Sequence, residues 1–200
     1  MYGGNQYRGK VKADEKINSS EEAAKEKSKA EEDKALPAEQ IKPIDRLPSD
    51  DMKGSLKKSE GFEEKPYNDS AGHCTIGYGH LLHKGACADE DFEKYKEGWT
   101  EDHANKVFDE DIAKHEEDVK KHVNVELTQG QYDALVHFAY NIGGDEFQNS
   151  TLLKKLNAGD YDSVPEEMRR WINITVNGKK QVSEGLKKRR EREIEMFKKK

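Results

Sequence analysis

The sequence predicts an α+β domain with two lobes: a small hairpin sheet in an N-terminal lobe and a mainly helical C-terminal lobe. Three observations support this prediction. Glycines and strand-forming residues are concentrated in one segment, residues 59–83, whereas capped patterns with helical periodicity fill residues 100–200. The sequence contains no internal repeat. With this order of elements, a ligand cleft is expected between the two lobes.

The composition indicates that part of the chain lies outside this domain. Hydrophobic residues make up only 32% of the 200 residues and charged residues 38%, which is too polar for one close-packed globule of that length. The stretch from Ser19 to Leu36 has strong helix formers without an apolar stripe, and a proline-spaced stretch follows it. We expect a charged leader or linker over residues 1–50, poorly ordered or loosely helical, and a folded domain over residues 51–200. The leader is alternatively a docking segment or the end of a longer polypeptide.

The charges are unevenly distributed along the chain. Residues 1–50 sum to about −1, residues 51–178 to about −11 and residues 179–200 to about +6, within a total of −6. An acidic body with a basic C-terminal helix is not typical of nucleic-acid-binding proteins, whose folded domains carry a basic face. Neither a membrane-spanning apolar run nor a secretory signal is recognisable in the sequence. We therefore expect no nucleic-acid partner, no stable membrane insertion, and synthesis in the cytoplasm without a secretory signal in this chain.

Two cysteines, Cys74 and Cys87, lie on opposite sides of the return of the predicted hairpin. They are either free thiols of a protein made in a reducing compartment or a disulfide formed after export. The sequence does not decide between these alternatives.

The N-terminal lobe combines a short helix with the hairpin. Asp50 or Asp51 can cap a helix that ends just after Glu60, so that Glu60 occupies its last turn. The segment that starts at Asp69 has the composition of a tight turn, because Asp bonds to nearby backbone groups and the glycine three residues later accepts a positive φ. A hairpin about this turn would bring Glu60, Asp69 and Thr75 together at its base.

Capped helices are predicted for most of the remaining sequence. A short acidic helix is expected over residues 89–98, and the most apolar helix is expected to end at Ile142. Asn177-Gly178 is expected to form a turn. The other expected helix starts each carry a capping hydroxyl: Thr100, Thr128, Ser150, Ser163 and Ser183.

The segment SEGFEEKPYNDSAGHCTIGYGHLLH, residues 59–83, resembles the active-site signature of the phage-type lysozymes, glycoside hydrolase family 24. The shared features are Glu60 followed by a glycine, Asp69 after eight intervening residues, Thr75 after five more, and the string ThrIleGly-x-GlyHis. Five further segments resemble the helical lobe of that family: FAYNIG, FQNSTLL, LNAGDY, RRW and GLKKRREREIEMF. The resemblance covers about residues 51–200 and leaves out only the leader.

The resemblance implies a peptidoglycan muramidase that hydrolyses the β-1,4 bond between N-acetylmuramic acid and N-acetylglucosamine without a metal or an organic cofactor. Such a reaction needs a proton for the departing oxygen and a second group that supplies or stabilises charge, and two carboxylates across the bond meet both needs. By resemblance, Glu60 is the catalytic acid, while Asp69 and Thr75 position a water on the opposite face, which gives inversion. Inversion requires the two carboxyl groups to lie roughly 6.5–9.5 Å apart.

The resemblance also implies a set of residues around the catalytic three. Four residues are expected to contact the sugar: Leu81, Tyr140, Asn141 and Trp171. The two aromatic residues among them are equally plausible as core residues. His80 is expected to pair with Asp111, a structural contact that would tie the hairpin to the long helix. Arg189 and Arg190 either reach toward Glu60 or face solvent, and neither is assigned a catalytic role.

Two other classes of function stay open at this point. A zinc-dependent cell-wall peptidase would use His73, His80 and His83 with Asp69, but the ligand pairs typical of zinc sites, such as His-Glu-x-x-His, are absent from the sequence. A non-catalytic wall-binding module would keep the cleft without turnover. The expected partners are peptidoglycan and either a delivery apparatus or an immunity protein, and the chain is expected to be a monomer.

The acidic body affects how such an enzyme would reach its substrate. Cell walls are anionic, so a basic protein gains association rate from their field and an acidic one does not. We therefore expect delivery at high local concentration, either as an endolysin during phage lysis or as an antibacterial effector of a phage-tail or contractile apparatus. In both cases the site of action is the cell wall, in the periplasm of the host or of a target bacterium.

Overall fold

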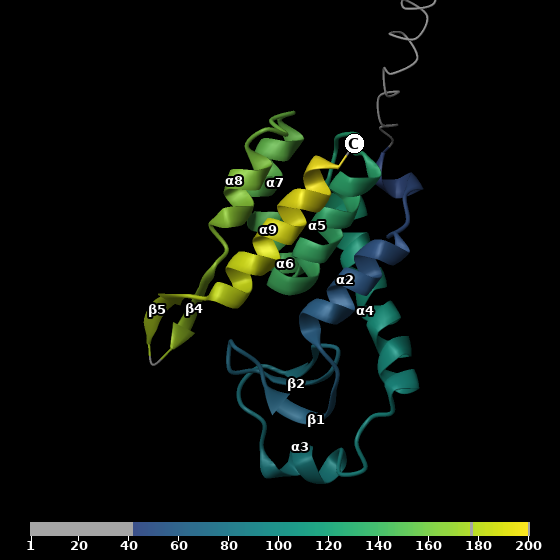
Figure 1. Cartoon of the computed structure of the whole chain (residues 1–200), viewed down its shortest axis with the longest axis vertical. Coiled ribbons are helices and arrows are strands. Elements are labelled where there is room, and N and C mark those ends of the chain that lie inside the picture. Colours follow the sequence, from purple (N-terminus) through teal and green to yellow (C-terminus); the bar gives the residue numbers. More distant parts are fainter. Residues whose placement is uncertain (1–41, 177, 200) are drawn as a thin grey trace, which may run out of the picture. The chain divides into compact units, whose positions relative to one another are not determined.

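Two antiparallel sheets and a series of helices make up the part of the chain that the computed structural model describes, residues 42–176 and 178–199 (Figure 1). This confirms the predicted α+β class. Residues 1–41, most of the predicted leader, lie outside the described part. Within that part, no helix is both long and apolar enough to cross a membrane.

The domain begins before the boundary that the sequence predicted. A 3-10 helix, η1 (Pro43–Asp45), replaces the extended conformation expected from the prolines, and Arg46 after it is largely buried. Arg46 Nε donates to the carbonyl oxygen of Leu127 at 3.0 Å, and Ser49 Oγ donates to Asp133 Oδ2 at 2.6 Å. This segment therefore packs on the helical lobe and belongs to the domain.

Helix α2 (Asp50–Glu60) positions the predicted acid. Its N-cap is Ser49, whose hydroxyl accepts from the backbone N–H of Met52, rather than either of the two expected aspartates. Gly61 ends the helix with a φ of 73°. Glu60 is therefore the last helical residue, in the last turn as predicted.

Three strands, rather than the two of the predicted hairpin, form the N-terminal sheet. Thr75 on the central strand pairs with Tyr67 on one side and with Leu81 on the other, both antiparallel. The third strand forms because Gly77 and Gly79 adopt positive φ values of 67° and 76° and turn the chain back. The strands follow one another in the sheet in sequence order: β1 (Glu63–Asn68), β2 (Cys74–Gly77) and β3 (His80–His83).

Two further helices follow the sheet. Helix α3 (Asp89–Lys94) is shorter than the helix expected there, and α4 (Glu101–His122) starts at the predicted cap, where Thr100 Oγ1 accepts from His103 N at 3.2 Å. Helices α2 and α4 run between the sheet and the remaining helices (Figure 1). They therefore link the two lobes.

The helical lobe is built around α5 (Gln129–Ile142), which begins at the predicted capping box. Thr128 Oγ1 accepts from Gln131 N, and Gln131 Oε1 accepts from Thr128 N. Ser163 does not cap its helix with the hydroxyl, which instead donates to Asp160 Oδ2 at 2.6 Å. Four further helices complete the lobe, of which the first was not predicted: α6 (Gly144–Asn149), α7 (Thr151–Asn157), α8 (Val164–Arg169) and α9 (Glu184–Lys198).

A second sheet follows α8 where the sequence predicted only a turn. Strands β4 (Asn173–Val176) and β5 (Lys179–Val182) pair antiparallel, and Gly178 between them has a φ of 74°. The sequence did not indicate these strands because β5 has no alternation of apolar and polar residues, and its side chains are all exposed. Asn177, the other residue of the predicted turn, lies outside the described residues.

Candidate active site

Glu60, the predicted acid, is paired with an arginine from the last helix. Arg189 Nη1 lies 2.8 Å from Glu60 Oε1, and the Arg189 and Glu60 side chains are only 9% and 16% exposed. From the sequence, Arg189 was expected either to reach toward Glu60 or to face solvent. The structure places it against Glu60. The pair joins the end of α2 to α9 and fixes one oxygen of the Glu60 carboxyl group.

Gly79 lies directly against the Glu60 carboxyl group. A Cβ atom at this position would stand 2.8 Å from Glu60 Oε2, and the φ of Gly79 is +76°. Both observations require glycine, because a side chain would collide with the carboxyl group and would strain the backbone. The Gly-x-Gly-His string of the sequence therefore shapes the space around Glu60.

Asp69 is held by its own turn. Its Oδ1 accepts hydrogen bonds from the backbone N–H groups of Ala71 and His73, both at 2.8 Å. These bonds fix the carboxyl group, as expected for an Asp that starts a turn. Because both bonds go to Oδ1, Oδ2 is the oxygen that can meet a water molecule.

Thr75 is buried in β2, directly opposite Tyr67 on β1. Its hydroxyl donates to the carbonyl oxygen of Tyr67 at 3.2 Å, so its lone pairs are left to accept. Burial raises the pKa of the Tyr67 phenol, the Thr75 hydroxyl lowers it, and the charges of Glu60 and Asp69 raise it further. The Tyr67 side chain is thus within electrostatic reach of both carboxylates. Sequence reasoning missed Tyr67, although its position opposite Thr75 in a hairpin was a signal for it.

Two adjoining cavities form a groove across these residues. One, of about 640 Å³, lies between the first sheet and helices α4 to α6, and the other, of about 530 Å³, lies between the Asp69 turn and the β4–β5 hairpin. Volumes of this size suit small-molecule or sugar ligands. Glu60 lines neither cavity, but Gly79, which covers its carboxyl group, lines the larger one. The two cavities share four lining residues: Asp69, Ala71, Asn141 and Ile142.

All four predicted sugar-contacting residues line this groove. Leu81 is 45% exposed on the sheet side. Trp171 lines the cavity beside the β4–β5 hairpin, and its ring also packs edge-on against Phe138, with centroids 5.8 Å apart. Trp171 therefore serves both as a core neighbour and as a wall of the groove.

Tyr140 likewise is both a core residue and a wall of the groove, the two alternatives that the sequence left open. Its hydroxyl donates to the carbonyl oxygen of Tyr78 at 2.8 Å, which holds α5 against the sheet lobe. Burial raises the pKa of Tyr140, and the charges of Glu60 and Asp111 raise it further. The phenol therefore stays protonated and keeps donating this hydrogen bond at any ordinary pH.

Asn141 is held by a buried charged network that sequence reasoning did not find. Its Oδ1 accepts from Arg190 Nη2 at 2.6 Å. Arg190 Nε lies 2.7 Å from Glu193 Oε2, and Glu193 Oε1 lies 2.8 Å from His137 Nδ1. Each of the last three residues is at most 1% exposed. Burial lowers the pKa of Arg190, whereas the Glu193 charge raises it. The network belongs to the core and reaches the groove through Asn141.

The expected contact between His80 and Asp111 is present, with His80 Nδ1 2.7 Å from Asp111 Oδ2. Asp111 Oδ1 also accepts from Lys114 Nζ at 2.8 Å. Burial acts to raise the pKa of Asp111, but the hydrogen bonds from His80 and Lys114 outweigh it and lower the pKa overall. The contact connects β3 to α4 and so lies between the lobes.

His115 on α4 also lines the larger cavity. Its ring packs edge-on against Tyr140, with centroids 5.3 Å apart. Burial lowers the pKa of His115, and Asp118, whose Oδ2 lies 3.3 Å from His115 Nδ1, partly offsets this. The neutral imidazole is therefore favoured in the folded protein.

The histidines of the zinc-peptidase alternative do not converge on one point. His73 Nδ1 accepts from the backbone N–H of Gly85 at 3.0 Å, His80 pairs with Asp111, and His83 pairs with an acid on α3. With three different partners, these histidines do not form the predicted alternative site.

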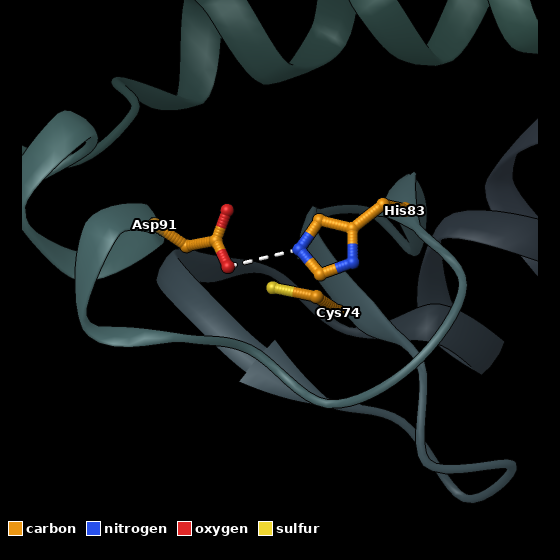
Figure 2. Close-up of side chains that lie close together, drawn as sticks. All are labelled: Cys74, His83 and Asp91. Atoms are coloured by element: carbon orange, nitrogen blue, oxygen red, sulfur yellow. Dashed lines mark hydrogen bonds and ion pairs between the residues drawn. The ribbon is translucent and has the colours of Figure 1, made fainter.

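A different group of possible metal ligands lies near the edge of the sheet, where Cys74, His83 and Asp91 approach one another (Figure 2). His83 Nε2 lies 2.9 Å from Asp91 Oδ2. The Cys74 sulfur is bonded to that of Cys87, so of the two alternatives left open by the sequence the structure has the disulfide. In this disulfide form neither sulfur is a thiolate.

Comparisons with known proteins agree with this arrangement. Residues 57–193 match the family described as Phage lysozyme. The chain is 39% identical over 144 residues to an endolysin of Acyrthosiphon pisum secondary endosymbiont phage 1, across 71% of this chain and 91% of that protein. Among solved structures it is similar to an endolysin from Escherichia coli O157:H7 phage FAHEc1, with 35% identity and a TM-score of 0.64 over 77% of this chain and 94% of that one. It is also similar to the muramidase domain of SpmX from Asticaccaulis excentricus, with 29% identity and a TM-score of 0.65 over 78% of this chain and 99% of that one. The chain therefore belongs to the phage lysozyme family of glycoside hydrolases.

Proposed function

We propose that the chain hydrolyses the β-1,4 bond between N-acetylmuramic acid and N-acetylglucosamine in peptidoglycan, with inversion at the anomeric carbon. Family membership identifies the chain as a lysozyme. What we propose in addition is the stereochemistry of the reaction and the role of each residue. The observation that supports this proposal most is that Asp69 and Thr75 line the larger cavity together with Gly79, which lies directly against the Glu60 carboxyl group.

Each of the three residues has a distinct task in this mechanism. Glu60 donates a proton to the departing glycosidic oxygen. A water molecule attacks the anomeric carbon from the opposite face and passes one proton to Asp69 Oδ2, while the Thr75 hydroxyl accepts a hydrogen bond from the other O–H of that water, which stays on the new anomeric hydroxyl group. One water is thereby added across the bond, and solvent restores the starting protonation of both carboxyl groups.

The surroundings of Glu60 fix the position of its carboxyl group. Arg189 fixes one carboxyl oxygen, and the absence of a side chain at Gly79 leaves room for the other. We infer that Arg189 is a positioning residue, which holds the acid in the geometry that proton transfer requires. The sugar would rest on Leu81 and Trp171, because flat apolar surfaces pack well against pyranose rings.

The variant Glu60→Gln tests the mechanism. We expect hydrolysis of purified peptidoglycan sacculi to fall by about 10²–10⁴-fold, since general acid catalysis contributes that much. Glu63→Gln is the matched control, because it is the same chemical change at an exposed position three residues away. This variant should retain full activity. The anomeric form of the first reducing end released, read by NMR, tests inversion.

Three outcomes would overturn the proposal. Undiminished hydrolysis by Glu60→Gln would show that Glu60 is not the acid. Retention of the anomeric configuration would show that the anomeric carbon is not attacked directly by a water molecule held by Asp69. If the wild-type protein bound sacculi without releasing muropeptides, the chain would be a wall-binding module. Insensitivity of hydrolysis to chelators would exclude the zinc peptidase.

We further infer that the chain acts as a monomer on the cell wall, delivered at high local concentration as an endolysin or as an antibacterial effector. The support is the net charge of −6, which gives no electrostatic attraction to an anionic wall. A delivery apparatus or an immunity protein would then be a partner. Killing of intact cells from outside by the purified chain, at the rate seen with isolated wall, would contradict the need for delivery.

A further inference from the structure

Four side chains of the types that bind zinc come together next to the first sheet, outside the groove. The ligating atoms of Cys74, His83 and Asp91 all lie within 4.8 Å of one another (Figure 2). Cys87 belongs to the same group, because its sulfur is bonded to that of Cys74. None of these four residues lines either cavity of the groove.

The sequence spacing of this group is compact. The four residues follow the pattern Cys-x8-His-x3-Cys-x3-Asp over 18 positions, 74 to 91. Closely spaced cysteine and histidine ligands that straddle a turn are the usual form of a structural zinc site. The pattern differs from the histidine cluster considered from the sequence, and it includes both cysteines of the chain.

The backbone holds the four residues together independently of the bond between the sulfur atoms. Cys74 pairs with His83 in the β2–β3 register, and Cys74 N donates to the carbonyl oxygen of Gly85 at 2.8 Å. Cys87 N donates to Asn68 Oδ1 at 2.7 Å. Reduction of the disulfide therefore leaves two thiols in place beside His83 instead of releasing them.

Further hydrogen bonds orient the other two ligands. His83 Nδ1 lies 3.2 Å from the carbonyl oxygen of Lys84, and because a carbonyl only accepts, Nδ1 carries the hydrogen and Nε2 faces the group. Asp91 Oδ2 accepts from the backbone N–H of Ala88 at 2.8 Å. Outer partners of this kind fix the orientation of metal ligands in zinc proteins.

We propose that the chain with reduced cysteines binds one zinc ion through the thiolates of Cys74 and Cys87, the Nε2 atom of His83 and the carboxylate of Asp91. A dithiol reductant supplies two electrons and two protons to the disulfide and is itself converted to a disulfide. Zinc then displaces the two thiol protons and takes the tetrahedral ligand set. A disulfide oxidant reverses the exchange: it accepts two electrons from the thiolates, and the ion is released.

The exposure of the ligands allows this exchange. The His83 side chain is 42% exposed and that of Asp91 is 16% exposed, whereas Cys74 is fully buried, so an ion can enter from the solvent side and reach the sulfur. The ion would fasten residues 84–91 to β2 in a reducing compartment, where disulfides are rare. Because Cys74 precedes Thr75, either link holds the strand that carries Thr75.

Titration of the full chain with Co²⁺ and Zn²⁺ tests this proposal. In a phosphine reductant we expect one Co²⁺ per chain, with thiolate charge-transfer absorption and the strong visible bands of a tetrahedral site, and displacement of Co²⁺ by Zn²⁺. The oxidised chain should show neither band. Zinc should also slow the alkylation of Cys74 and Cys87, a readout that does not depend on glycosidase activity.

Variants identify the ligands. Asp91→Asn and His83→Gln should each weaken zinc binding at least tenfold, because even outer-shell substitutions cost 10–100-fold. Asp89→Asn, the same change on an exposed residue of the same helix, should bind zinc as the wild type does. The proposal is wrong if the reduced wild type gives no one-to-one tetrahedral complex. It is also wrong if Asp91→Asn and Asp89→Asn bind zinc equally, or if His83→Gln retains full affinity.

Discussion

Two consecutive arginines of α9 meet glutamates in opposite surroundings. Arg189 contacts Glu60 beside the groove, whereas Arg190 contacts Glu193 in the core, where both side chains are at most 1% exposed. In the core, loss of one partner leaves a charge without compensation. Beside the groove, water and substrate can take the place of a lost partner. We therefore expect the same two residue types to serve stability in the core and to position the proposed acid beside the groove.

The largest effect expected from this comparison is on stability. Glu193→Gln should lower the free energy of unfolding by about 3–5 kcal/mol, because Arg190 would remain buried without its carboxylate. Glu195→Gln, two residues away and exposed, should change it by less than about 0.5 kcal/mol. Urea denaturation of both variants measures the difference. Equal stability of the two would mean that the core pair contributes no more than a surface charge.

The groove pair should show the opposite behaviour. Arg189→Gln should reduce hydrolysis of sacculi by about 10–100-fold, because a misplaced catalytic group costs rate of this order. Its stability should fall less than that of Glu193→Gln, since Glu60 can be solvated after the change. Lys188→Gln is the control, because Lys188 is the exposed neighbour on the same helix. A loss of stability in Arg189→Gln without a loss of rate would assign Arg189 to structure.

A third arginine extends the comparison to a neutral partner. Arg46 donates to the carbonyl oxygen of Leu127, and it lies in a segment that the sequence assigned to the leader. Deletion of residues 1–41 should leave the melting temperature and the hydrolysis of isolated wall unchanged. Deletion of residues 1–48 also removes this contact and should cost about 1.5–3 kcal/mol, the value of a hydrogen bond to a charged group. Equal melting temperatures for the two truncations would show that the contact adds nothing.

The smallest expected effect concerns His115, which lies beside the groove, in contrast to the fully buried His137. Because burial lowers the pKa of His115 below 6.5, the folded protein binds its proton less readily than the unfolded chain. The resulting stability is present above pH 6.5 and is lost as the pH falls through the lower folded pKa. Asp118, Asp111 and Lys114 set the size of this shift.

His115→Gln removes that titration. The free energy of unfolding, measured from pH 8 to pH 5, should fall less steeply for the variant than for the wild type. The contribution of Asp111 is separable, because its pKa is lowered from 3.8 and its stability is lost only in more acidic solution. Parallel curves for the two proteins above pH 5 would contradict the assignment of a lowered pKa to His115.

The local features of the fold were predictable because they depend on short sequence signals. The end of α2 at Glu60, the turn at Asp69 and the cap at Thr128 each follow from residues within one turn of the chain. The resemblance added the contact between His80 and Asp111, which are 31 residues apart. No local rule could have supplied that contact.

The missed features depend on packing between distant segments. Glu193 has the sequence context of a surface helix, and its burial becomes apparent only when α9 packs against α5 beside His137. The β4–β5 hairpin was missed because β5 has only exposed residues and no alternating pattern. The cap of α2 was misplaced by one or two residues because Ser49 and the two aspartates after it are all good capping residues.

Gly79 has a consequence for how mutational scans of this chain should be interpreted. Its positive φ is a backbone conformation that other residues adopt poorly, and one oxygen of Glu60 occupies the space where a side chain would stand. Any substitution there is expected to perturb folding and the proposed proton donor at the same time. A survey scored on lysis alone will rank this site with the reacting groups, although glycine itself transfers nothing.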